Sequence, residues 1–111
     1  MGEQSMTVIE VTDEAFESAT RDGWALVDFY ATWCPHCREF RPHYEAVAEG
    51  HTGNVTFLAA DVDTARGAGE RFSVSTIPTI VLLHQGALVA RHSGVLRPDE
   101  LADWLGRHTA G

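Results

Sequence analysis

The two cysteines of the chain, Cys34 and Cys37, are the residues whose spacing points most directly to chemistry. If Cys34 caps a helix and Pro35 is the first helical residue, ideal geometry places the two cysteine Cα atoms roughly 5 Å apart. That separation lies within the range that a disulfide requires. The pair could therefore open and close with little backbone movement, as thiol–disulfide exchange demands.

The two thiols are not expected to be equivalent. Cys34 would meet the free N–H groups and the positive end of the helix, which favour a thiolate. Cys37 lies one turn further on, in an apolar stripe with Phe40 and Tyr44. We therefore expect Cys34 to be exposed and activated, and Cys37 to be sheltered and able to resolve a mixed disulfide.

Other uses of a cysteine pair fit this sequence less well. A zinc site needs about four ligands, and the chain has no second cysteine pair and no histidines spaced as in a zinc finger. Covalent haem attachment requires a histidine where this chain has Arg38. An inert disulfide would stabilise the fold little across so short a loop. The pattern therefore favours a redox site without a metal.

The pair must be positioned by elements that alternate along the chain. The sequence predicts strands over 7–11, 24–30, 55–62, 79–84 and 87–92 and helices over 13–22, 35–50, 65–72 and from Pro98 onward. Thr12 is expected to cap the first helix, and Asp63 with Thr64 the third. Strands separated by helices predict an α/β sandwich, with the last hairpin adding antiparallel strands. In such sheets functional residues gather at the carboxyl ends of strands, where Cys34 lies.

Length and charge narrow the possible partners. The chain has 111 residues, which predicts a single domain over 6–111 preceded by a loose leader at 1–5. Its net charge is −8 and all eight basic residues are arginine, which argues against a nucleic-acid partner. Neither a membrane-spanning run nor a signal-peptide pattern is visible, so we expect no membrane association and a cytoplasmic location.

A set of motifs also occurs in a fixed order between about Thr7 and Leu105. They are Val-Asp-Phe-Tyr-Ala at 27–31, Trp-Cys-Pro-His-Cys at 33–37, Pro42, Thr-Ile-Pro-Thr at 76–79, Gly86 and Gly94. This ordered set resembles the thioredoxin family. The resemblance implies a three-layer α/β/α sandwich in which four helices flank a five-stranded mixed sheet of strand order 1-3-2-4-5.

The resemblance also implies an activity. It indicates a thiol–disulfide oxidoreductase that reduces protein disulfides, with Cys34 as nucleophile and Cys37 as resolving thiol. It implies no cofactor beyond the redox-active disulfide, a monomer, and recycling by an enzyme such as thioredoxin reductase. Trp33, Thr76, Ile77, Pro78 and Gly94 would bind the substrate, with Pro78 as a cis-proline facing the disulfide.

Asp28 is the candidate proton acceptor. It interrupts an apolar strand, and in this family the matching residue lies behind the resolving cysteine, Cys37. Burial would raise the pKa of the Asp28 carboxyl and suit it to accept a proton. The family often keeps a lysine near this aspartate. Here that position matches Ala59, so the sequence predicts that the charge partnership around Asp28 is missing.

The residues between the cysteines depart from the usual Gly-Pro of thioredoxins. Pro35 and His36 form the pair found in the oxidase DsbA, and a protonated His36 would favour the Cys34 thiolate. A smaller residue than Thr76 usually precedes the Ile-Pro pair. A net oxidant or isomerase of DsbA-like poise is therefore one alternative function, and a non-catalytic binding module is a less favoured one.

Overall fold

The sheet of the computed structural model, which describes residues 7–109, has the expected five strands; the expected leader at 1–5 lies outside the described residues. The strands are β1 (Val8–Glu10), β2 (Trp24–Tyr30), β3 (Val55–Asp61), β4 (Thr79–His84) and β5 (Ala87–Ser93). Their order is β1-β3-β2-β4-β5. β3 pairs in parallel with both β1 and β2, whereas β4 is antiparallel to β2 and to β5. The predicted order is therefore confirmed.

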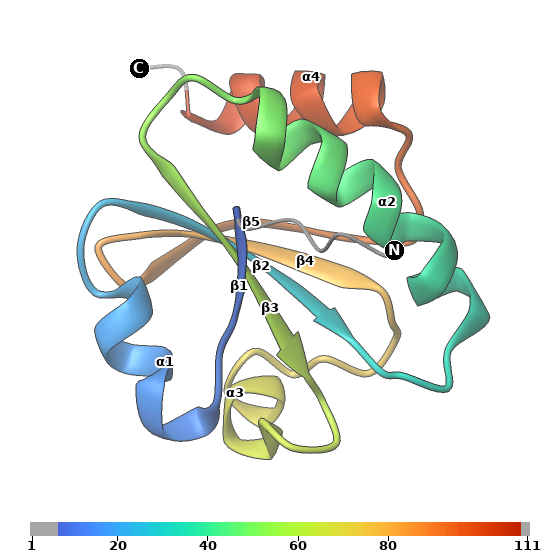
Figure 1. Ribbon diagram of the computed structural model, residues 1–111. Coiled ribbons are helices and arrows are strands. Elements are labelled where there is room, and N and C mark those ends of the chain that lie inside the picture. Colours follow the sequence, from blue (N-terminus) through green and yellow to red (C-terminus); the bar gives the residue numbers. More distant parts are fainter. Residues whose placement is uncertain (1–6, 110–111) are drawn as a thin grey trace.

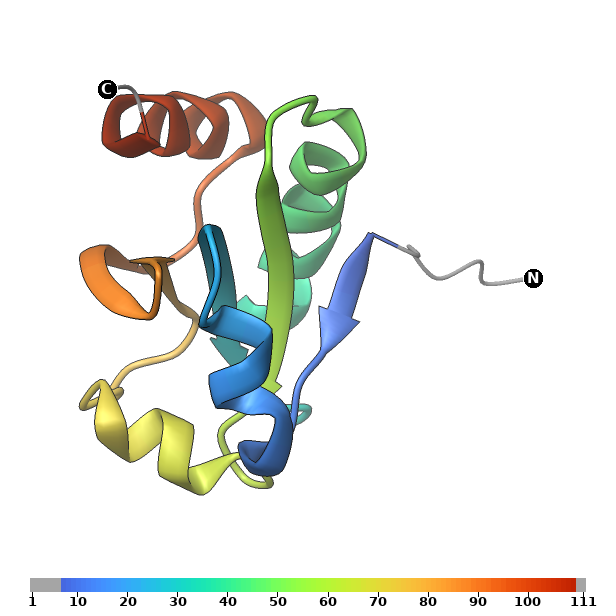
Figure 2. The ribbon, with the colours of Figure 1, turned by 90° about the vertical axis from the view of Figure 1, so that its left-hand side faces the viewer.

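Residues 7–109 form four helices, which cover the sheet on both faces (Figures 1 and 2). They are α1 (Asp13–Thr20), α2 (Pro35–Gly50), α3 (Arg66–Arg71) and α4 (Pro98–Thr109). Helices α1 and α3 lie on one face, and α2 and α4 lie on the other (Figure 1). Within residues 7–109, no helix combines the length and the apolar character needed to cross a membrane.

The central strand β2 is buried on both faces because each face packs against a helical layer. Phe29 packs with Phe16 and Phe72 on the side of α1 and α3. Leu26 points to the opposite side, among the apolar side chains of α2 and α4. This explains why β2 does not alternate between polar and apolar residues.

Two helix starts differ from the expectation. Thr12 occupies the N-cap position of α1, but its side chain makes no capping hydrogen bond. Helix α3 begins at Arg66, one residue later than predicted, and its N-cap residue is Ala65 rather than Asp63 or Thr64. Its first N–H groups are instead satisfied from α1, because the Asp13 carboxylate accepts hydrogen bonds from the backbone N–H groups of Gly67 and Ala68, each at 2.9 Å.

The strand pairing brings the chemically interesting segments together. Phe29 near the end of β2 is in register with Thr79 at the start of β4, and Thr79 is in register with Ser93 at the end of β5. The start of α2 follows β2 after a short turn. The cysteine pair, the residues just before β4 and Gly94 therefore meet at one edge of the sheet.

Candidate redox site

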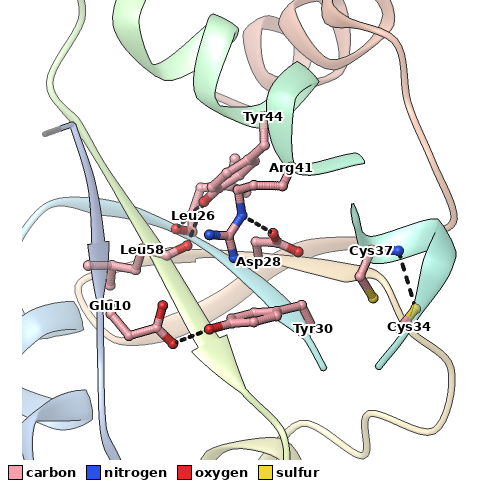
Figure 3. Close-up of polar contacts among 9 residues, drawn as sticks. All are labelled: Glu10, Leu26, Asp28, Tyr30, Cys34, Cys37, Arg41, Tyr44 and Leu58. Atoms are coloured by element: carbon pink, nitrogen blue, oxygen red, sulfur yellow. Dashed lines mark hydrogen bonds and ion pairs between the residues drawn. The ribbon is translucent and has the colours of Figure 1, made fainter. Parts of the chain in front are cut away.

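Cys34 is the N-cap residue of α2, as the sequence predicts. Its backbone is extended (φ −92°, ψ 113°) and Pro35 is the first helical residue. The Cys34 sulfur accepts a hydrogen bond from the backbone N–H of Cys37 at 3.2 Å (Figure 3). An N-cap side chain normally receives such a bond through oxygen. Here the sulfur does so, which places the positive end of the helix against Cys34.

The expected difference in exposure between the two cysteines is wrong. Cys34 retains 5% of its accessible surface and Cys37 retains 3%, so both are buried. Cys34 is covered because Ile77 packs against it, and its sulfur lies 3.9 Å from the Ile77 carbonyl oxygen. The two thiols are distinguished by their surroundings rather than by their exposure.

Cys37 lies in surroundings that hold its proton. Burial acts first, and the hydrogen bond with Cys34 and the nearby charges of Cys34 and Asp28 add to it, so that the pKa of the Cys37 thiol rises to about 12. At neutral pH, Cys37 is therefore a thiol. It can attack as a thiolate only if a neighbouring group accepts its proton.

Asp28 is buried behind this thiol on the face of β2 that packs against α2. Burial is the main reason that the pKa of its carboxyl rises from the ordinary 3.8 to about 6, and the charge of Arg41 acts in the opposite direction. Arg41 Nε lies 3.2 Å from Asp28 Oδ2. The other oxygen, Oδ1, is buried and has no hydrogen-bond partner among the described residues.

Asp28 therefore has a charge partner, Arg41. The sequence-based prediction that the charge partnership around Asp28 is missing is wrong. Ala59 is directly opposite Asp28 in the pairing of β2 with β3, and it supplies no charge. The partner comes instead from α2. Arg41 follows Cys37 by four residues, and its guanidinium reaches the carboxylate from the helix side (Figure 3).

A groove runs beside the cysteines. A pocket of about 390 Å³ is lined by His36, Glu39, Ile77, Pro78, Gly94 and Val95. The Ile77–Pro78 peptide is cis, as the resemblance implies. The Gly94 N–H donates to the Pro78 carbonyl at 2.9 Å, and Gly94 adopts a φ of 105° that favours glycine.

The remaining predicted residues, Trp33 and Thr76, do not line this pocket. Trp33 is 63% exposed, and its indole N–H donates to Asp63 Oδ2 at 2.8 Å. Thr76 is exposed, and its carbonyl accepts a hydrogen bond from the Thr79 hydroxyl. Among residues 7–109, no group of three or more His, Cys, Asp or Glu side chains is arranged to hold a metal ion.

Comparisons with known proteins agree with this geometry. The family model of thioredoxin matches residues 7–107. The thioredoxins of Staphylococcus aureus strains Mu50 / ATCC 700699 and MW2 are each 34% identical to this chain over 103 residues. Those alignments cover 93% of this chain and 99% of each staphylococcal protein.

The chain belongs to the thioredoxin family. It is a thiol–disulfide oxidoreductase, and membership of the thioredoxin family implies that its substrates are proteins with disulfides.

Three functional candidates in this thioredoxin-family chain were missed by the sequence reasoning. Arg41 could have been found from its spacing, since residues four apart share one helix face and Cys37 is on the buried stripe. Glu39 could have been found in the same way, three residues after His36. The contact of Asp63 with Trp33 spans 30 residues and left no local signal.

Proposed function

We propose that Cys34 attacks the disulfide of a protein substrate and that Cys37 resolves the product. The Cys34 thiolate forms a bond to one substrate sulfur and expels the other as a thiolate. Cys37 then loses its proton, attacks the Cys34 sulfur, and expels the second substrate sulfur. Two electrons pass to the substrate, and a Cys34–Cys37 disulfide remains. The hydrogen bond from the Cys37 N–H to the Cys34 sulfur is the observation that carries this assignment of roles.

Asp28 is the acceptor of the Cys37 proton in this scheme. Its Oδ1 is free to take a proton, and its charge acts on Cys37. With a pKa of about 6, the carboxyl is mostly ionised near neutral pH and can still be protonated transiently. The transfer is direct or passes through one water molecule.

The substrate lies along the groove lined by Ile77, Pro78 and Gly94, with Trp33 and Thr76 at its sides. The main support is position, because this groove includes His36 beside Cys34 and is next to the Cys34 sulfur. His36 and Pro35 tune the site from the outer side of the helix start. Thr76 is exposed two residues before Pro78, which leaves it accessible to an extended substrate segment.

The net direction is reduction of partner disulfides, followed by recycling of the oxidised protein by a reductase such as thioredoxin reductase. No organic cofactor or metal takes part, since the electrons are stored in the cysteine pair. We further propose that the protein acts as a monomer in the cytoplasm, as one domain over 6–111.

Reduction of insulin disulfides tests this proposal. The protein, thioredoxin reductase and NADPH are mixed with insulin, and NADPH consumption is followed. The wild type should turn over repeatedly, and Cys34→Ser should lose all turnover. The matched variant Cys37→Ser should also fail to turn over but should form a covalent adduct. Turnover by Cys34→Ser would overturn the assignment, and no turnover by the wild type with any reductant would overturn the function.

A further inference from the structure

We propose that Arg41 is a positioning residue for the redox reaction: it holds the buried Asp28 carboxylate in its charged form and keeps Oδ1 free for the Cys37 proton. This inference rests on the proposed role of Asp28 as the proton acceptor. In the family, a lysine often lies near this aspartate, and the matching residue on β3 is Ala59. Arg41, on helix α2, would take the place of that lysine.

The first support is the geometry of the pair. Arg41 Nε donates to Oδ2 of Asp28 at 3.2 Å, so the guanidinium occupies one carboxylate oxygen only. Figure 3 shows the Asp28 carboxyl between the Arg41 guanidinium and the Cys37 side chain. A carboxylate anchored by one oxygen presents the other in a fixed direction. Arg41 therefore orients the acceptor as well as stabilising its charge.

The second support is the space across the sheet. Glu10 on β1 is in register with Ala59 on β3, and Ala59 is in register with Asp28 on β2. The three residues form one row on the face that packs against α2. Because the alanine side chain is short, the row has room above β3 for a side chain that comes from the helix. The Arg41 guanidinium lies on this face of the sheet and reaches Asp28 from helix α2.

The third support is a second contact that fixes the guanidinium. Its central carbon lies 4.5 Å from the centre of the Tyr30 ring. The Tyr30 hydroxyl in turn donates to Glu10 Oε2 at 2.7 Å. Arg41 is thus held between the Asp28 carboxylate and a tyrosine ring that is tied to the edge strand (Figure 3).

The charges around Asp28 show why a cation is needed. Glu10 on β1 and Glu45 on α2 both act against its ionisation, and burial does so more strongly. Tyr44 and Cys37 also face the carboxylate from α2, and both keep their protons near neutral pH. Arg41 is the group that opposes all of these effects.

Arg41 also separates Asp28 from solvent. The Arg41 side chain is 27% exposed, whereas that of Asp28 is 1% exposed. A pocket of about 260 Å³ is lined by Tyr30, Ala31, Thr32, Cys37, Arg38 and Arg41. Shortening Arg41 to alanine would therefore admit water as well as remove the charge. Arg41→Met keeps most of the volume and removes the charge together with the hydrogen bond to Asp28.

The test is an NMR titration of the Asp28 carboxyl carbon in the reduced protein. Arg41→Met should raise its titration midpoint by about one pH unit or more, a tenfold change in proton affinity. Arg41→Lys should restore most of the wild-type midpoint. Arg38→Met is the matched control, because Arg38 is on the same helix but its side chain donates to the Thr32 carbonyl instead. It should shift the midpoint much less.

A kinetic measurement links the titration to catalysis. The wild type and Arg41→Met are each joined through Cys34 to a peptide thiol, and release of the peptide by Cys37 is timed across pH. The release rate falls at low pH, where Asp28 is protonated. In Arg41→Met this fall should occur at a higher pH, by the same number of pH units as the shift of the Asp28 midpoint. Arg41→Gln is a second neutral variant, should Arg41→Met fail to fold.

The outcomes separate the two proposals. An Asp28 midpoint that stays at its wild-type value in the neutral Arg41 variants overturns the inference about Arg41. A shifted midpoint without a matching shift in the pH at which the release rate falls also overturns the positioning role. If Asp28→Asn releases the peptide at the wild-type rate across the whole pH range, the proposed role of Asp28 fails, whatever the titration shows for Arg41.

Discussion

At the scale of single residues, Asp28 makes folding depend on pH. Its pKa rises from 3.8 to about 6 on folding because burial outweighs the Arg41 charge, so the folded protein binds this proton more tightly than the unfolded chain does. The associated stability is fully present below about pH 4 and is lost as the pH rises through about 6. The Arg41 pair reduces this loss but does not abolish it.

We expect Asp28→Asn to stabilise the protein near neutral pH and not at low pH. The rise in pKa corresponds to about 3 kcal/mol, and an amide carries no charge to bury. Urea unfolding of both proteins near pH 7 and near pH 4 measures the difference. If Asp28→Asn raised the free energy of unfolding equally at both pH values, the account would be contradicted, because the gain would not depend on ionisation of a buried Asp28 carboxyl.

The two thiols should differ in reactivity although both are buried. Cys37 is held as a thiol by its raised pKa, whereas the Cys34 sulfur accepts a hydrogen bond at the helix start and borders the groove. Alkylation of the reduced protein near neutral pH should therefore label Cys34 first, by about tenfold or more. Peptide mapping of the adduct by mass spectrometry gives the answer. Preferential labelling of Cys37 would reverse the assigned roles.

His36 has a partner that weakens its expected effect on the redox potential. Its Nδ1 lies 3.6 Å from Glu39 Oε1, and both side chains are largely exposed. A protonated His36 would stabilise the Cys34 thiolate, which exists only in the reduced state, but Glu39 offsets part of that charge. The protein should therefore be only slightly more oxidising than a thioredoxin with Gly-Pro between its cysteines.

Glu39→Gln should raise the reduction potential by about 20 mV or less, which is the scale of one exposed ion pair. Equilibration with glutathione buffers measures the potential, and the double variant Pro35→Gly with His36→Pro is the reference for a usual thioredoxin dipeptide. A Glu39→Gln potential below that of the wild type would contradict this account of His36.

At the scale of elements, the start of α3 is stabilised by a side chain from α1. The Asp13 carboxylate accepts hydrogen bonds from the N–H groups of the second and third residues of the helix, which lie 54 and 55 residues away along the chain. Asp13→Ala should cost about 1 to 2 kcal/mol of unfolding free energy. Glu14→Ala is the control, because it removes a charge from the same turn of α1 without touching α3. Equal effects of the two variants in denaturant unfolding would argue against the cap.

The elements show which parts of the fold were predictable. The strands and helices were found because each carries a local pattern, such as the uninterrupted apolar run of β2. The expected cap of α3 by Asp63 and Thr64 is wrong because the hydrogen bonds to its first turn come from Asp13, far away in the sequence. The spacing of Arg41 from Cys37 indicates that the two residues share one helix face, but only the tertiary structure shows the contact of Arg41 with Asp28.

The location of the candidate site could be predicted from the sequence, but the burial of its cysteines could not. The cysteine spacing and the motif order indicated its place, and the sheet order follows from the family. The expected exposure of Cys34 failed because Ile77 covers it from a loop 43 residues away. Contacts of this kind depend on how β4 pairs with β2, which no local pattern specifies.

At the scale of the whole molecule, the fold brings two segments that are far apart in the sequence to one edge of the sheet. The end of β2 leads into the helix that carries both cysteines, and the antiparallel pairing of β4 returns Ile77 and Pro78 to the same place. The buried carboxylate is part of the central strand, and its cation belongs to the helix above it. The carboxylate of the site is therefore built into the core.

Trapping of the mixed disulfide tests the central claim most directly. Cys37→Ser is reacted with insulin, and the covalent adduct is measured by mass spectrometry before and after reduction with dithiothreitol. The account predicts that Cys37→Ser accumulates an adduct through Cys34 that dithiothreitol releases, and that Cys34→Ser accumulates almost none. Equal accumulation by the two variants would contradict the division of labour between the cysteines on which the proposed mechanism rests.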